Sequence, residues 1–274
     1  MKKILVPTDF SESAINATKA AADIARKTNA ELILLHIIEL PQEGSDAVQQ
    51  GFEIPEIMFF KQHAEQKLTE ASTSPDLANL TVYAVLKLGR ALENVTEVAE
   101  ANDVDLIVMG SHGSSGYKEF FIGSNAEKVV RNSQTPVLVV KNNANELKYE
   151  KVVFATDFLV ENEKALAKAI NILKSFGIKP HFLMVNTVNN FKPTHIAEEI
   201  ANNFFTENNI TDYDFTIYND LDIEKGIINF TEKIGGDLIA MGTHGRKGFS
   251  KFLNGSISED IVNHSEKTIL TFKI

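Results

Sequence analysis

Residues 3–10, Lys-Ile-Leu-Val-Pro-Thr-Asp-Phe, decide the fold, because they return at residues 151–158 as Lys-Val-Val-Phe-Ala-Thr-Asp-Phe. Residues 105–113, Asp-Leu-Ile-Val-Met-Gly-Ser-His-Gly, likewise return at 237–245 as Asp-Leu-Ile-Ala-Met-Gly-Thr-His-Gly. Repeated segments in a fixed order indicate that one structural unit occurs twice. We therefore interpret the chain as a tandem duplication.

The duplication predicts two domains joined by a short linker. We place the first domain at residues 1–141, the linker at 142–150 and the second domain at 151–274. The first half carries 16 more residues than the second half between its two repeated segments. We assign them to a loop at 40–56, which contains two prolines and two glycines.

Each half reads as strands that alternate with helices. Short apolar runs without periodicity, such as residues 4–6, are typical of parallel strands that are buried on both faces. In the first half we expect strands near 4–6, 31–38, 81–86, 106–109 and 136–140, and helices after Ser11 and over 55–72, 91–101 and 124–131. In the second half we expect strands near 151–155, 181–186, 213–218, 238–241 and 268–272. This order predicts an α/β fold of two open, five-stranded parallel sheets with helices on both faces, and a ligand site beyond the carboxyl ends of the strands.

The composition argues against several classes of protein. The chain has 274 residues, a formal net charge of −10 and no cysteine. Without cysteine it has no disulfide framework, thiolate zinc site or iron–sulfur cluster. Acidic residues are in excess in both halves, which argues against binding to nucleic acid or to anionic membranes. Since no apolar run approaches the roughly 20 residues of a membrane span, we expect a soluble, cytoplasmic protein.

Two glycine-rich segments point to phosphate binding. After the expected fourth strand, Gly110-x-x-Gly113 is followed by nine residues and then by Gly123-Ser124, and the second half repeats this spacing from Gly242. Glycines let the backbone approach an anion closely, and the N–H groups at a helix start favour negative charge. The alternative is that these glycines only turn the chain and cap a helix. The repeated spacing favours a functional site.

The glycine spacing, together with an aspartate just after the first strand, resembles the universal stress protein family over nearly the whole chain. The resemblance implies two tandem family domains, each an open sheet of strand order 3-2-1-4-5. It also implies that ATP or AMP is held between strands one and four of each half.

Carried over by position, the resemblance implies contacts to the base and ribose from the ends of strands one and two, and contacts to the ribose and phosphates from the glycine loop. In the first half the implied residues are Thr8, Asp9, Ile37, Met109, Gly110, Ser111, His112, Gly113, Gly123, Ser124 and Asn125. In the second half they are Thr156, Asp157, Val185, Met241, Gly242, Thr243, His244, Gly245, Gly255, Ser256 and Ile257.

Several of these residues have a second interpretation. Asp9 and Asp157 are also candidates for capping the first helix of each half. The two loop histidines fit hydrogen bonding better than catalysis, because the spacing places no carboxylate beside them, so we assign no catalytic residue.

No motif for a dedicated metal site is present, although Mg²⁺ bound through the phosphates fits the pattern. The cations Arg246 and Lys247, where the first half has two serines, favour a triphosphate in the second site.

We therefore expect a stress-response regulator or sensor that binds adenine nucleotide in both halves and has an unidentified protein partner. One alternative is a scaffold or chaperone-like protein with vestigial loops, and another is a slow ATP hydrolase. In the family the last strand forms the dimer contact, so residues 137–140 and 269–272 are expected to pair within this chain. That pairing would create an internal pseudo-dimer, and it leaves a further homodimer open.

Overall fold

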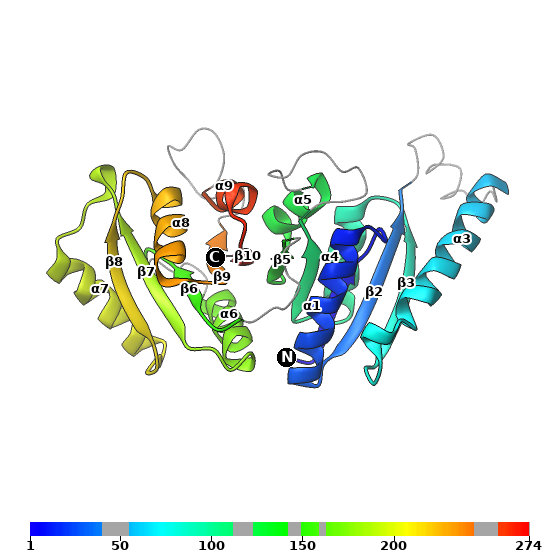
Figure 1. Ribbon diagram of the computed structural model, residues 1–274, viewed down its shortest axis with the longest axis horizontal. Helices are drawn as coiled ribbons and strands as arrows, with labels where there is room; N and C mark the ends of the chain where they lie inside the picture. The colour runs from blue at the N-terminus through cyan, green and yellow to red at the C-terminus, as the bar shows by residue number, and fades with distance from the viewer. Residues whose placement is uncertain (40–54, 112–122, 142–148, 159–162, 244–256, 274) are drawn as a thin grey trace.

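The computed structural model describes residues 1–39, 55–111, 123–141, 149–158, 163–243 and 257–273. Its strands form one ten-stranded sheet in the order β3-β2-β1-β4-β5-β10-β9-β6-β7-β8 (Figure 1). Read outward from the centre, the order is the same on both sides, so the two halves of the chain repeat one topology. The strand order 3-2-1-4-5 is confirmed for each half.

The first half supplies one side of the sheet. Its strands are β1 (Lys3–Pro7), β2 (Glu31–Ile38), β3 (Val82–Leu88), β4 (Leu106–Gly110) and β5 (Val137–Val140). Its helices are α1 (Glu12–Thr28), α3 (Pro55–Ser72), α4 (Ala91–Ala101) and α5 (Ser124–Asn132), with a 3-10 turn η1 (Pro75–Leu77).

The second half supplies the other side of the sheet. Its strands are β6 (Val152–Ala155), β7 (Pro180–Asn186), β8 (Asp214–Asn219), β9 (Leu238–Thr243) and β10 (Thr268–Lys273). Its helices are α6 (Glu163–Ser175), α7 (Thr194–Glu207), α8 (Ile223–Ile234) and α9 (Ile257–His264), with a 3-10 turn η2 (Val188–Asn190). The strands expected from the sequence are present in both halves, with ends that agree within two residues.

The two blocks of parallel strands are joined rather than separate. β5 pairs antiparallel with β10, with Val139 opposite Ile269 and Val137 opposite Thr271. The expected pairing of the two last strands within one chain is confirmed. The expectation of two individual sheets is refined to one continuous sheet, because this pairing supplies partners for the backbone groups of both inner edges. The expected loop at 40–56 and linker at 142–150 lie almost wholly outside the described residues, so their limits stay predictions.

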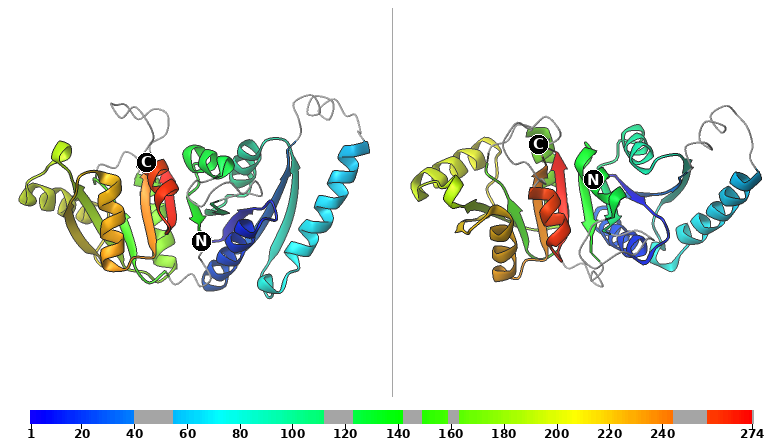
Figure 2. Two further views of the ribbon diagram at one scale, coloured as in Figure 1. Left: turned by 45° about the horizontal axis from the view of Figure 1, so that its top comes forward. Right: turned by 90° about the horizontal axis from the view of Figure 1, so that it is seen from above.

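Helices cover both faces of the sheet. α1, α3, α6 and α7 pack over one hydrophobic cluster and α4, α5, α8 and α9 over the other. α3 lies at one extremity of the molecule and α7 at the other (Figures 1 and 2). The central strands are buried along their length, which explains why their sequences are apolar without alternation. The ligand site expected at the carboxyl ends of the strands is therefore framed by helices from both layers.

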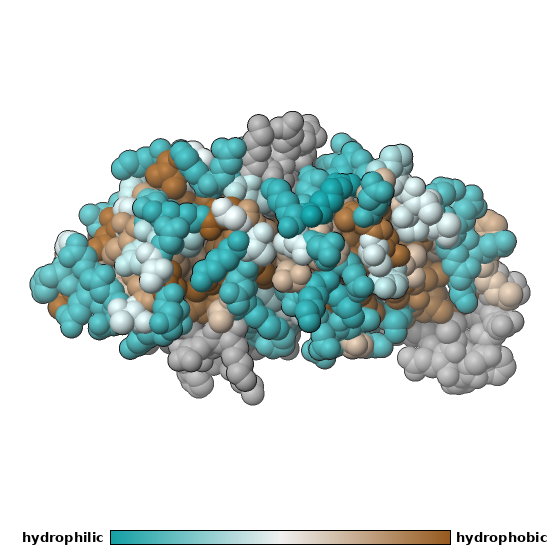
Figure 3. All heavy atoms as spheres, turned by 90° about the horizontal axis from the view of Figure 1, so that it is seen from below, coloured by the Kyte–Doolittle hydropathy of each residue, from teal (hydrophilic) through white to brown (hydrophobic). Residues whose placement is uncertain are grey.

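The surface is mixed in character. Seen from below, hydrophilic side chains are interrupted by several small hydrophobic areas (Figure 3). Among the described residues, no helix is both long enough and apolar enough to cross a membrane.

A buried lysine crosses the junction of the two halves. Lys141 follows β5 and is only 9% exposed, and its Nζ donates to the Val262 carbonyl of α9 at 2.6 Å. Burial lowers the pKa of Lys141 from 10.5 to about 8. This hydrogen bond connects the end of the first half to a helix of the second half.

The lowered pKa of Lys141 predicts a pH-dependent stability. Between pH 8 and pH 10.5 the unfolded chain holds a proton that the folded chain has lost, so the free energy of unfolding rises with pH in this window. We expect the wild type to gain on the order of 2 kcal/mol relative to Lys141→Met from pH 7.5 to pH 10, measured by urea unfolding. Parallel pH profiles for the two proteins would contradict this.

Tyr149 predicts a stabilising substitution. Its ring stacks on Phe176 with centroids 5.3 Å apart, and its buried hydroxyl has no hydrogen-bond partner among the described residues. Burial also raises the pKa of the hydroxyl. We expect Tyr149→Phe to raise the free energy of unfolding by about 1 kcal/mol, because it removes an unpaired polar group and keeps the ring. A loss of stability in denaturant melts would show that the hydroxyl is bonded.

Candidate functional site

A cavity of about 470 Å³ opens where the carboxyl ends of β1 and β4 diverge. Strand β1 leads into α1 on one face of the sheet, and α5 packs on the other face, so the described helices leave a space at the ends of the two strands. The strand order expected from the sequence places the ligand site at this position. Eight of the implied first-half residues line the cavity: Thr8, Asp9, Ile37, Met109, Gly110, Gly123, Ser124 and Asn125.

The turn after β1 shapes one wall of the cavity. The Thr8 N–H donates to the Leu35 carbonyl at 2.8 Å, which continues the β1–β2 pairing by one residue. Thr8 Oγ1 accepts from the Phe10 N–H at 3.1 Å, and Phe10 adopts a left-handed φ of 64°. This tight turn directs the chain from the strand into α1 and leaves the exposed side chain of Asp9 at the cavity.

The capping interpretation of Asp9 needs a correction. The N-cap of α1 is Ser11, whose Oγ accepts from the Ala14 N–H at 3.2 Å. Asp9 Oδ1 instead accepts from the Ser11 N–H at 3.0 Å. Asp9 therefore accepts a hydrogen bond from the N-cap residue and is not the N-cap itself. The helix begins three residues after Asp9, at Glu12.

His36 of β2 contacts the same turn through its ring. Its Nδ1 lies 2.7 Å from the Thr8 carbonyl oxygen, and its ring packs against Phe10 at 4.5 Å. Since a carbonyl only accepts, this contact requires the proton on Nδ1. His36 was not among the residues expected from the sequence to form the site. A histidine in a strand carries no signal of what it contacts in the next strand.

The end of β4 depends on Gly110. A Cβ at this position would lie 2.3 Å from Ser13 Oγ and 2.7 Å from the Ser13 carbonyl carbon and oxygen. Glycine thus lets β4 pass directly beside the first turn of α1. The next residue, Ser111, is fully buried, and its N–H donates to the Val140 carbonyl at 3.0 Å. Ser111 does not line the cavity, although the resemblance implied that it contacts ligand.

The start of α5 forms the opposite wall. Gly123 is the N-cap and makes no side-chain cap, so the N–H groups of the first turn are not closed off by a capping side chain. Asn125 Nδ2 lies 3.5 Å from Glu39 Oε1, and all three residues line the cavity. A helix start of this kind favours an anionic group. Glu39 adds a carboxylate that the sequence analysis did not identify.

The remaining walls are mainly apolar and were missed by the sequence analysis. They come from Pro7, Ala14, Leu35, Ala91, Val95, Ala126 and Val129. Such residues look like ordinary core positions in the sequence. That their side chains face a cavity follows only from the arrangement of β1 and β4 in space.

The second half repeats the turn after its first strand. Thr156 Oγ1 accepts from the Phe158 N–H at 2.9 Å, and Phe158 has the same φ of 64° as Phe10. Asp157 is exposed, Val185 and Met241 are buried, and Gly242 lies at the end of β9. Thr243 is also buried, and its Oγ1 donates to the Phe272 carbonyl at 3.4 Å.

Part of each implied site lies outside the described residues. This holds for His112, Gly113, His244, Gly245, Gly255 and Ser256, and for the cations Arg246 and Lys247. Ile257 begins α9, but its side chain is not described. The implied roles of these residues stay predictions.

Comparisons with known proteins agree on one family. The sequence model of the universal stress protein family matches residues 1–141 and 218–273. A universal stress protein of Synechocystis is 23% identical over 296 residues, and the match covers 100% of both chains. One of Methanocaldococcus jannaschii is 32% identical over 151 residues, which cover 53% of this chain and 85% of that protein.

A solved structure matches the fold over the whole chain. The crystal structure of a universal stress protein from Archaeoglobus fulgidus has a TM-score of 0.76 at 22% identity. The match covers 99% of this chain and 98% of the other chain. At this identity the likeness concerns the fold, and it extends to both halves.

The close approach at Gly110 predicts a destabilising substitution. We expect Gly110→Ala to lower the free energy of unfolding by about 1–3 kcal/mol, because the methyl group meets the backbone of α1. Adding Ser13→Ala should not rescue the loss, since the Ser13 carbonyl group remains. Denaturant melts of the single and double variants test this, and a Gly110→Ala protein as stable as the wild type would contradict it.

Proposed function

The chain belongs to the universal stress protein family, and we propose that the cavity in its first half binds an adenine nucleotide. The observation that carries the proposal is the convergence of distant segments on one cavity. Residues from the ends of β1, β2 and β4 and from the start of α5 line it together. ATP and AMP are both candidates, because they share the adenosine that would fill the cavity and differ in the phosphate tail.

The size and lining of the cavity suit adenosine. Its volume of about 470 Å³ lies in the range of roughly 300–1,000 Å³ that is common for small-molecule sites. Leu35, Ile37, Val95 and Met109 offer apolar surface to a flat base. We propose that the base lies against these side chains.

The polar groups suit the ribose and the phosphates. A carboxylate such as Asp9 accepts hydrogen bonds from hydroxyl groups, as a ribose would supply. The N–H groups at the start of α5 and the Ser124 hydroxyl donate, as phosphate oxygens require. We propose that the ribose faces Asp9 and that the phosphates extend toward α5.

Glu39 supports a role for a divalent cation. Its carboxylate is within reach of Asn125, next to the helix start that would face the phosphates. Two negative groups at this end repel each other unless a cation lies between them. Mg²⁺ is commonly held by phosphates and one or two carboxylates, so we propose Mg²⁺ bound through the nucleotide.

We propose a regulatory or sensing role rather than strong catalysis. Among the described residues that line the cavity, the ionisable side chains are Asp9 and Glu39. Asp9 accepts from the Ser11 N–H and Glu39 contacts the Asn125 amide, and both are structural contacts. Slow ATP hydrolysis is the enzymatic alternative, and it would show as turnover above background. The scaffold alternative predicts no nucleotide affinity at all. A cytoplasmic location and a protein partner are further parts of the proposal.

Asp9→Asn tests the proposed ribose contact. The amide oxygen can still accept from the Ser11 N–H, so the turn is preserved while the charge is lost. We expect the affinity for ATP and AMP to fall about 10- to 100-fold in calorimetric titrations with Mg²⁺, because charged hydrogen bonds are strong.

Asp76→Asn is the matched control, because this aspartate is also exposed but lies in η1, away from the cavity. Nucleotide released on denaturing the purified protein, identified by mass, gives a second readout. No released nucleotide together with no heat on titration would refute the proposal and support the scaffold alternative.

A further inference from the structure

The two halves share a topology but differ in the side chains around the proposed site. We infer that the first half alone binds the nucleotide, because the second half fills the equivalent space with side chains of α8. This inference rests on the proposed function, and it concerns which half performs it. It replaces the expectation of nucleotide binding in both halves with one nucleotide per chain.

Helices α4 and α8 correspond residue by residue. Arg90 is the N-cap of α4 and Asp222 is the N-cap of α8. From these caps onward the two helices show the same sequence of buried, half-buried and exposed positions. The correspondence places Ile223 at the position of Ala91 and Ile227 at the position of Val95.

The exchanged residues are larger in the second half. Ala91 and Val95 line the cavity of the first half. Ile223 has three more side-chain carbons than alanine, and Ile227 has one more than valine. Ile227 is 2% exposed and belongs to the same hydrophobic cluster as Val185 and Met241, and Ile223 packs against this cluster. Val95 is as buried as Ile227, so the difference that we infer lies in the added carbons, which would extend into the region that lies open in the first half.

A glycine brings α8 closer to the sheet. A Cβ at Gly226 would lie 2.5 Å from Val185 Cγ1, so the helix backbone rests directly on this side chain. Val185 is accordingly only 8% exposed, whereas its counterpart Ile37 is half-buried and lines the cavity. At the position of Gly226 the first half has Asn94, whose amide donates to the Arg90 carbonyl at 2.9 Å. Glycine is a poor helix former, and this close packing explains its presence in mid-helix.

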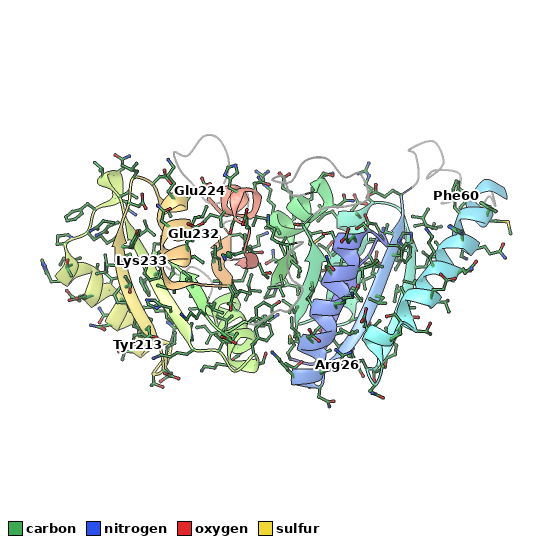
Figure 4. All side chains as sticks on the ribbon, in the orientation of Figure 1. Arg26, Phe60, Tyr213, Glu224, Glu232 and Lys233 are labelled. Carbon is green, nitrogen blue, oxygen red and sulfur yellow. The ribbon has the colours of Figure 1, made fainter. Side chains whose placement is uncertain are left out.

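The second half also lacks the histidine that contacts the turn after the first strand, and it has an ion pair between two of its helices. Met184 stands where His36 contacts the Thr8 carbonyl, and its thioether has no N–H to donate. Glu224 on α8 pairs with His264 on α9 at 2.6 Å, and Figure 4 shows Glu224 on the side of α8 that faces α9. The pair holds together the two helices that flank the filled space.

Calorimetric titration of the wild type and of three variants measures how many nucleotides bind and to which half. Wild-type protein is titrated with ATP and Mg²⁺ by calorimetry, and we expect one equivalent per chain. Ala91→Ile copies the second half into the first, and it should weaken this binding at least tenfold. Ile223→Ala copies the first half into the second, and it should add a second equivalent. Glu232→Ala, an exposed change on α8, is the control that should retain one equivalent.

Each outcome decides the inference. Two equivalents in the wild type would overturn it while leaving the proposed function intact. Unchanged affinity in a folded Ala91→Ile protein, as judged by circular dichroism, would also overturn it, because an isoleucine at this position would then not block a nucleotide. If Ile223→Ala gains no second equivalent, Ile223 is not the blocking residue and the steric argument fails. No binding to the wild type would refute the proposed function itself.

Discussion

The architecture depends on the antiparallel pairing of β5 with β10. Each block of five strands ends on an apolar strand that is buried in the assembled chain, and alone it would expose unpaired N–H and C=O groups along that strand. Pairing the two last strands satisfies both edges with one set of hydrogen bonds. The outer edges are then β3 and β8, and these strands carry more exposed positions. Lys141 adds a contact across the same junction.

The sequence was sufficient for the fold because its information is local and repeated. Short apolar runs predicted the strands, and capping residues such as Ser11 predicted the helices. The duplication predicted two copies of one unit, and the resemblance to a known family implied the strand order. The candidate site was predictable where it consists of glycines and polar residues at strand ends, such as Asp9 and Gly110. The apolar walls of the site were not predictable, because the sequence around Val95 or Leu35 does not distinguish a cavity-lining residue from a core residue.

The contacts that the sequence did not reveal are those between elements distant in the chain. His36 bonds a carbonyl of the neighbouring strand, and Glu39 meets an amide from α5. Gly226 is a comparable case. A glycine is needed at this position of α8 because the helix backbone packs directly against Val185 of β7. Duplication keeps the backbone of both halves alike, while such long-range contacts diverge. Two copies of a motif therefore do not guarantee two equal sites.

The position of β10 in the middle of the sheet has a consequence for biosynthesis. At roughly 5–20 residues per second, the ribosome delivers β10 on the order of 10 s after its partner β5. During this interval the nascent first half presents β5 as an uncovered strand edge. An uncovered edge can recruit a strand from another nascent chain, so assembly on a polysome competes with closure of the chain on itself.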